Sequence, residues 1–102
     1  MTVLRNENRW DRSNVEFSND LVAVYSKRRV TPAMQYIDYG LNVLSRSCFE
    51  RFGLTGRFDL ADLFEALAER GELAGFEVEQ RFYEIGSPAG LAETEEYLRA
   101  HR

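Results

Sequence analysis

Acidic and basic side chains at separate places in the chain could carry chemistry. Glu84 ends a β-rich stretch just before Gly86 and Ser87, and a carboxylate there could hold Mg²⁺, which prefers oxygen ligands. The structural alternative for Glu84 is a solvated carboxylate at a strand end. Lys27 opens the basic run Lys27-Arg28-Arg29, whose ammonium and guanidinium groups could meet a phosphate or could only solvate a loop.

The stretch Tyr36–Leu44 offers a third place. Its apolar and polar residues alternate, which predicts a strand with one apolar face and one face open to ligand or solvent. On the polar face, Asp38 could accept hydrogen bonds from hydroxyl groups, and Gly40 could let a ligand approach the backbone. The alternative is that Gly40 makes room for a packed helix and that Asp38 lies at the sheet edge.

Composition excludes several other kinds of site. The 102 residues include one cysteine, Cys48, and one histidine, His101, so a disulfide, a multi-thiolate zinc site and a buried Ser-His-Asp triad are not expected. The formal net charge is −4, from 13 Lys and Arg against 17 Asp and Glu, which argues against a nucleic-acid-binding face. No apolar run approaches the roughly 20 residues that span a bilayer, and we expect no membrane partner and a cytoplasmic location.

Short strands are predicted for the first half of the chain. Thr2–Leu4 is a brief apolar start, followed by a polar loop from Arg5 to Asn14. Val15–Phe17 and Leu21–Tyr25 flank Ser18-Asn19-Asp20, which is turn chemistry and predicts a β-hairpin. The strand expected over Tyr36–Leu44 comes next.

Helices are predicted for most of the second half. Ser47-Cys48-Phe49-Glu50 fits a capping box. Asp59 can cap a helix carrying Leu60, Leu63, Phe64 and Leu67, and Gly71 ends it. Phe76–Glu84 is β-rich, and Ser87-Pro88 predicts a helix start whose amides face phosphate or are capped by the Ser87 hydroxyl. In that helix Leu91, Thr94 and Leu98 are expected to face inward.

These elements describe a mixed α/β unit, in the order strand, strand, strand, helix, helix, strand, helix. One domain with a radius of gyration of about 13 Å is expected for this length. Such a small sheet would leave an edge exposed, which suggests part of a larger sheet or a homodimer formed through that edge.

Several strings, in order along nearly the whole chain, resemble the sugar-phosphate nucleotidyltransferases (nucleotide-sugar pyrophosphorylases). Phe82–Leu91, F-Y-E-I-G-S-P-A-G-L, is similar to the family's aromatic-x-acid-x-G-[TS]-P-x-x-L strand–turn–helix. Ile37–Leu44, I-D-Y-G-L-N-V-L, resembles its N-x-G-[IL]-x-x-[LF] strand, and Tyr25–Lys27 falls where the family has an acid-Lys-Pro signature. The residues of these motifs most resemble those of the branch of the family that acts on mannose or heptose 1-phosphates, often with GTP.

The resemblance implies a Rossmann-like nucleotide-diphospho-sugar transferase fold and a role for each matching residue. Lys27, Asp38 and Gly40 would bind the sugar 1-phosphate, and Glu84, where most relatives have Asp, would hold Mg²⁺ beside it on the same side of the sheet. Ser26 replaces the usual acidic neighbour of the lysine. No protein nucleophile is implied, because this chemistry depends on positioning and charge neutralisation.

The family's Gly-rich G-G-x-G-[ST]-R loop, which cradles the nucleoside triphosphate, is not found in these residues. We therefore expect the chain to represent the C-terminal, sugar-phosphate side of a nucleotidyltransferase, inactive alone, with the nucleoside triphosphate held by the N-terminal half. The alternative is a non-catalytic module derived from the family, which binds sugar phosphate or dimerises.

Overall fold

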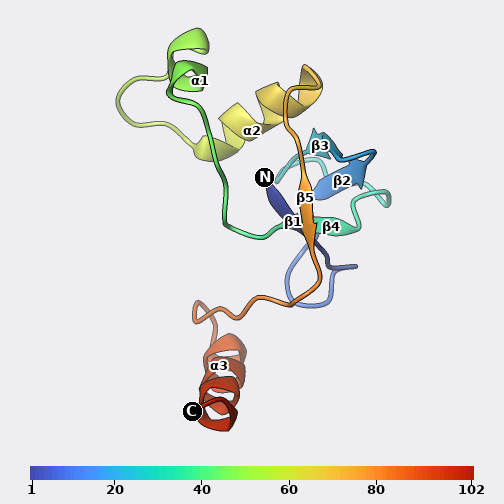
Figure 1. The fold of residues 1–102 in the computed structure, drawn as a ribbon, viewed down its shortest axis with the longest axis vertical. Helices are drawn as coiled ribbons and strands as arrows, with labels where there is room; N and C mark the ends of the chain where they lie inside the picture. Colours follow the sequence, from blue (N-terminus) through green and yellow to red (C-terminus); the bar gives the residue numbers. More distant parts are fainter.

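The computed structural model describes residues 1–102 as a five-stranded mixed sheet with three helices (Figure 1). The strands are β1 (Thr2–Arg5), β2 (Val15–Ser18), β3 (Leu21–Tyr25), β4 (Tyr36–Asp38) and β5 (Phe76–Val78). The helices are α1 (Arg46–Arg51), α2 (Leu60–Glu69) and α3 (Pro88–Ala100). The mixed α/β class predicted from the sequence is confirmed. None of the three helices is both long and apolar enough to cross a bilayer.

The sheet has the order β3-β2-β4-β1-β5, with β1 antiparallel to β4 and parallel to β5. The short apolar start of the chain is therefore an inner strand, which the predicted element order omitted. The two edge strands approach each other at one end, because Val22 N donates to Leu73 O and Gly75 N donates to Asp20 O, each over 2.9 Å. The sheet is consequently curved, and these hydrogen bonds partly join its two edges.

The predicted hairpin is confirmed. β2 and β3 pair antiparallel, and Asn19 and Asp20 in the turn both have positive φ values, 53° and 60°. A two-residue turn with both φ values positive matches the twist of the paired strands, and Asn and Asp tolerate this conformation.

The hydrophobic core lies between the sheet and α2. Val3, Val15 and Val22 are almost fully buried against the inner stripe of α2, which includes Leu63, Phe64 and Leu67. Asp59 caps α2 through a 2.9 Å hydrogen bond from Ala61 N, as the sequence predicts.

Two predicted strands are shorter in the structure. The first ends at Asp38, because Gly40 adopts a φ of 93° and its N–H donates to Asp38 Oδ1, turning the chain out of the sheet. Leu41 and Val43, expected on its apolar face, are exposed. The other, β5, ends at Val78 instead of continuing to Glu84.

The predicted capping box is also wrong. The N-cap of α1 is Ser45, whose side chain makes no capping hydrogen bond, and Ser47 lies inside the helix. Ser45 Oγ is instead 3.1 Å from both Ser47 Oγ and Cys48 Sγ.

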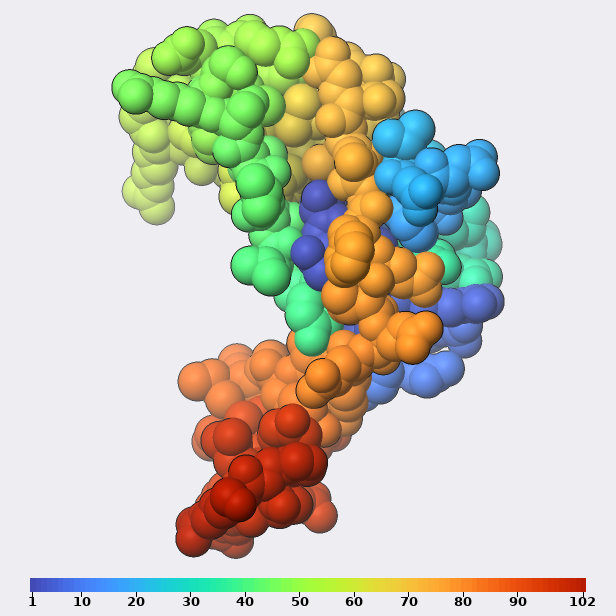
Figure 2. All heavy atoms as spheres, in the orientation of Figure 1, coloured from blue at the N-terminus to red at the C-terminus, as the bar shows by residue number.

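α3 extends away from the sheet and from the other helices (Figures 1 and 2). Its start at Ser87-Pro88 agrees with the prediction, but the expected inward face does not form. Leu91 and Leu98 are 54% and 60% exposed, and the only buried residue of the helix is Gly90. The projecting helix gives the molecule a radius of gyration of 15.0 Å, above the value of about 13 Å expected for a compact chain of this length.

Candidate functional site

Three of the four residues singled out from the sequence line one cavity. Lys27 follows β3, Asp38 ends β4, and Gly40 lies in the turn after it. The cavity has a volume of about 380 Å³, within the range of small-ligand sites. We call it the Asp38 cavity. Its other polar lining residues are Asp11, Arg12, Asn14, Asn42 and Asp59.

A turn built by Ser26 places Lys27 in the Asp38 cavity. Ser26 is buried, and its Oγ accepts hydrogen bonds from Arg28 N at 3.2 Å and Arg29 N at 3.0 Å. Ser26 N in turn donates to Asn14 O over 3.1 Å. Ser26 thus has a local structural task, and the basic run begins where the chain leaves β3.

Asp38 is held by its own turn. Its Oδ1 accepts from Gly40 N at 2.9 Å and from Asn42 Nδ2 at 3.1 Å, while its backbone N–H donates to Asn14 Oδ1 over 3.1 Å. Gly40 is required here by its positive φ and not by crowding, since a Cβ at this position would meet nothing within 4 Å. The open space beside Gly40 is consistent with a ligand approaching the backbone.

The sequence reading missed Asp59 and Arg12 as members of this site. The sequence predicts Asp59 only as a helix cap, yet its Oδ1 lies 3.9 Å from Lys27 Nζ. Arg12 belongs to the polar loop before β2 and forms no ion pair within the chain. No local signal marks either residue as part of a site, because long-range folding brings them to Lys27 and Asp38.

Hydrogen bonds hold that loop in a defined shape. Asn6 and Ser13 are fully buried, and Asn6 Nδ2 donates to Asp11 O at 2.6 Å and to Ser13 Oγ at 3.0 Å. Ser13 N donates to Asn8 Oδ1 over 2.8 Å. A loop expected only to be polar is therefore an ordered wall of the cavity.

The Asp38 cavity contains more negative than positive charge. Three carboxylates (Asp11, Asp38, Asp59) and two cations (Arg12, Lys27) line it. The buried Tyr25, which packs edge-on against Phe64, also contributes to the lining. Burial raises the pKa of Tyr25 to about 12, and the carboxylates of Asp38, Asp59 and Glu65 add to the shift. The two cations can pair with an anionic group and the carboxylates can accept hydrogen bonds from hydroxyl groups, while the net negative charge of the lining opposes anion binding.

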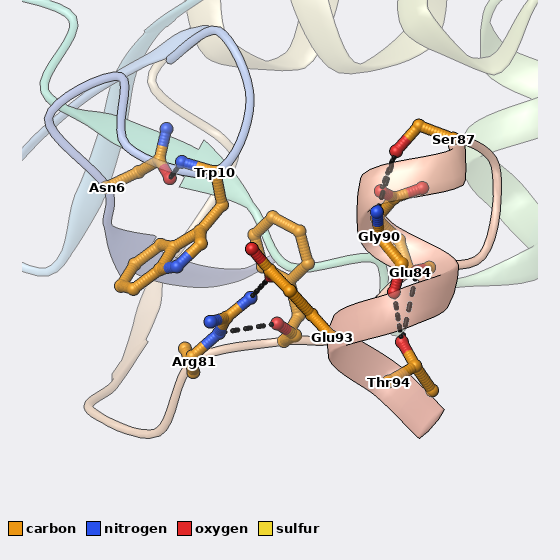
Figure 3. Close-up of polar contacts among 9 residues, drawn as sticks. Asn6, Trp10, Arg81, Glu84, Ser87, Gly90, Glu93 and Thr94 are labelled. Atoms are coloured by element: carbon orange, nitrogen blue, oxygen red, sulfur yellow. Dashed lines mark hydrogen bonds and ion pairs between the residues drawn. The ribbon is translucent and has the colours of Figure 1, made fainter. Parts of the chain in front are cut away.

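Glu84 lies in a second cavity, of about 220 Å³, between the Trp10 loop and the start of α3 (Figure 3). We call this the Glu84 cavity. The Arg81 guanidinium lies 4.9 Å from the Trp10 ring centre and 4.3 Å from that of Tyr83, and pairs with Glu93 over 2.8 Å. Trp10 is thus engaged in anchoring its loop to the chain segment before α3.

The Glu84 side chain is built into the turn that starts α3. Oε2 accepts from Gly86 N at 2.6 Å, and Oε1 accepts from Ser87 Oγ at 2.8 Å. Ser87 Oγ also accepts from Gly90 N over 3.0 Å, so the helix N-terminus is capped by this hydroxyl. Gly90 is needed for close approach, because a Cβ there would overlap the Glu84 carboxyl group.

The structure does not bring Glu84 into the Asp38 cavity, so the expected single pocket containing Glu84, Lys27 and Gly40 is not seen. The two cavities are neighbours. Arg9 and Trp10 line the Glu84 cavity, while the next two residues of the same loop line the Asp38 cavity. Phe82 joins the two regions through edge contacts with Trp10 and with Tyr39, both at 6.2 Å between ring centres.

Comparisons with protein-family models, curated proteins and solved structures found no match to this chain.

Proposed function

We propose that the chain is the sugar-phosphate side of a sugar-1-phosphate nucleotidyltransferase and that the Asp38 cavity binds the sugar 1-phosphate. The observation that best supports this proposal is that Lys27, Asp38 and Gly40 lie around the same cavity. Lys27 comes from one segment of the sequence and Asp38 and Gly40 come from another, and folding brings the two segments to one cavity. The Rossmann-like transferase fold and the mannose or heptose class of sugar are part of the same proposal.

In the proposed reaction a phosphate oxygen of the sugar 1-phosphate attacks the α-phosphorus of a nucleoside triphosphate, and pyrophosphate leaves. The task of this chain is to bind and orient the attacking phosphate. Lys27 and Arg12 would neutralise its charge, and Asp38 would accept hydrogen bonds from sugar hydroxyls. The Gly-rich triphosphate loop is not found in these residues, so nucleotide binding would be supplied from outside them.

Mg²⁺ belongs to this proposal, with Glu84 as the residue that would hold it. Each Glu84 oxygen already accepts one hydrogen bond, but a carboxylate oxygen has a second lone pair. No three His, Cys, Asp or Glu side chains are grouped to hold a metal, and two carboxylates, Glu84 and Glu93, line the Glu84 cavity, with Glu93 paired to Arg81. That is compatible with Mg²⁺, which takes one or two carboxylates together with waters and substrate phosphates, and which neutralises phosphate charge when bound.

Paramagnetic Mn²⁺ tests the metal assignment without any turnover. Titrating Mn²⁺ into the chain should broaden the amide resonances of Gly86 and Ser87, and Glu84→Gln should abolish this broadening. Equal broadening in both proteins would remove Glu84 from the proposal.

Isothermal titration calorimetry with mannose 1-phosphate tests the sugar-phosphate site. Lys27→Gln should weaken binding about tenfold, as expected for losing one charge-assisted contact worth about 1.5 kcal/mol. Arg28→Gln is the matched control, because Arg28 is an exposed neighbour that does not line the cavity. We expect no pyrophosphate release from GTP and mannose 1-phosphate by the chain alone. Failure of the unmodified chain to bind at millimolar concentration would contradict the proposal.

A non-catalytic binding or dimerisation module is the second candidate, and an exposed apolar groove beside β5 favours it. Phe76, Leu41 and Val43 are 71%, 67% and 90% exposed, and they line a groove of about 520 Å³. Sedimentation equilibrium distinguishes the candidates. A dimer that Phe76→Ser dissociates, together with no sugar-phosphate binding, would favour the module.

A further inference from the structure

Asn42 and Asp38 form an asymmetric pair at the edge of the Asp38 cavity. Asn42 Nδ2 donates to Asp38 Oδ1 over 3.1 Å, and the same oxygen accepts from Gly40 N at 2.9 Å. Asp38 Oδ2 receives no hydrogen bond from within the chain. One carboxylate oxygen is therefore committed to the turn, and the other remains available to a donor from outside.

The orientation of the Asn42 amide is dictated by Asp38. Turning the amide over would place its carbonyl oxygen against the carboxylate, and two acceptors would then face each other. The amide nitrogen must point to Asp38, and as a result Asn42 Oδ1 is buried without any hydrogen-bond partner. A buried polar atom left unpaired costs about 1 to 3 kcal/mol, so an arrangement that keeps one calls for an explanation.

We propose that Asn42 is a positioning residue, which holds Asp38 Oδ1 in the turn so that Oδ2 is presented to a hydroxyl group of the bound sugar phosphate. This inference rests on the proposed function of the cavity. It goes beyond that function by specifying how the site distinguishes a sugar phosphate from a bare phosphate. Lys27 and Arg12 bind the phosphate. Asp38, held in place by Asn42, accepts a hydrogen bond from a hydroxyl group of the sugar.

Hydrogen exchange tests the positioning role without a ligand. If Asn42 holds Asp38 Oδ1 in place, Asn42→Ala should speed exchange of the Gly40 amide about tenfold. Asn42→Leu should do the same, because it keeps the approximate shape of the side chain, adds no charge and cannot donate. Leu41→Ala, at an exposed neighbour, is the control and should leave the rate unchanged. An unchanged rate in both Asn42 variants would overturn the inference.

Calorimetry with two ligands tests the hydroxyl readout. Both Asn42 variants should bind mannose 1-phosphate at least tenfold more weakly and inorganic phosphate within twofold of the unmodified chain. Equal losses for the two ligands, or no loss, would overturn the inference. If the unmodified chain binds neither ligand, the proposed function fails, and the hydroxyl role of Asp38 fails with it. The Gly40 exchange result would still decide separately whether Asn42 positions the carboxylate.

Discussion

Lys27 Nζ lies 3.9 Å from Asp59 Oδ1, the same oxygen that accepts the capping hydrogen bond from Ala61 N. One carboxylate thus both starts α2 and faces the proposed phosphate-binding lysine. The two side chains are 58% and 55% exposed, so their ion pair contributes little to stability. Its importance lies in the electrostatics of the cavity, where Asp59 competes with a phosphate for Lys27.

Substitutions at Asp59 should separate these two tasks. Asp59→Asn retains a good capping residue and removes the charge, so the free energy of unfolding should stay nearly constant while mannose 1-phosphate binds several-fold more tightly. Asp59→Ala removes the cap as well and should cost about 1 kcal/mol of stability. Urea unfolding and calorimetry measure the two effects. Weaker binding in Asp59→Asn would instead indicate that this carboxylate contacts the ligand.

Stability should depend on Tyr25 at alkaline pH. Its pKa is raised to about 12, above the value of about 10 for an unfolded chain. The folded state therefore keeps the phenol proton to higher pH than the unfolded state does. This contribution to stability is fully present below about pH 10 and is lost as the pH rises toward 12, by at most about 1.4 kcal/mol per pH unit.

Urea unfolding between pH 9 and 11.5 measures this dependence. Tyr25→Phe should reduce the slope, and Asp38→Asn should reduce it partly, because the Asp38 carboxylate adds to the shift. An identical slope in Tyr25→Phe would show that another group causes the alkaline loss.

Gly90→Ala should loosen the start of α3 even though alanine is the better helix former. A Cβ at this position would overlap the Glu84 carboxyl group, which would have to leave Gly86 N and Ser87 Oγ. Hydrogen exchange in residues 91–100 should become faster, and ellipticity at 222 nm should fall. Ala92→Ser, at an exposed position of the same helix, is the control. Helix propensity alone predicts a gain of about 1 kcal/mol, so increased helicity would contradict the packing argument.

Local signals predicted much of the fold. The Asn19-Asp20 turn, the Asp59 cap with its apolar stripe, and the Ser87-Pro88 helix start each depend on contacts among near neighbours, and the structure confirms them. Strand lengths were overestimated, because alternation continues past Asp38 while the backbone turns at Gly40. The inner position of β1 was missed because it depends on pairing with two distant strands.

The candidate site was predictable to the extent that its residues belong to recognisable strings. The sequence predicts Lys27, Asp38 and Gly40 as site residues, and the structure places all three on one cavity. Arg12 and Asp59 reach that cavity through long-range folding, and no local pattern marks them. The sequence also could not show that Glu84 lies apart from these residues. A carboxylate at this position is equally suited to building a turn and to binding a ligand.

Amide chemical-shift mapping with mannose 1-phosphate is the most direct test of the sugar-phosphate assignment. In two-dimensional ¹H–¹⁵N spectra, the account predicts saturable shifts for Lys27, Asp38, Gly40 and Arg12, with Phe76 and Leu98 unmoved. Inorganic phosphate should shift Lys27 and Arg12 but leave Asp38 nearly unchanged. An absence of saturable shifts at these residues, or shifts confined to the apolar groove beside β5, would contradict the assignment.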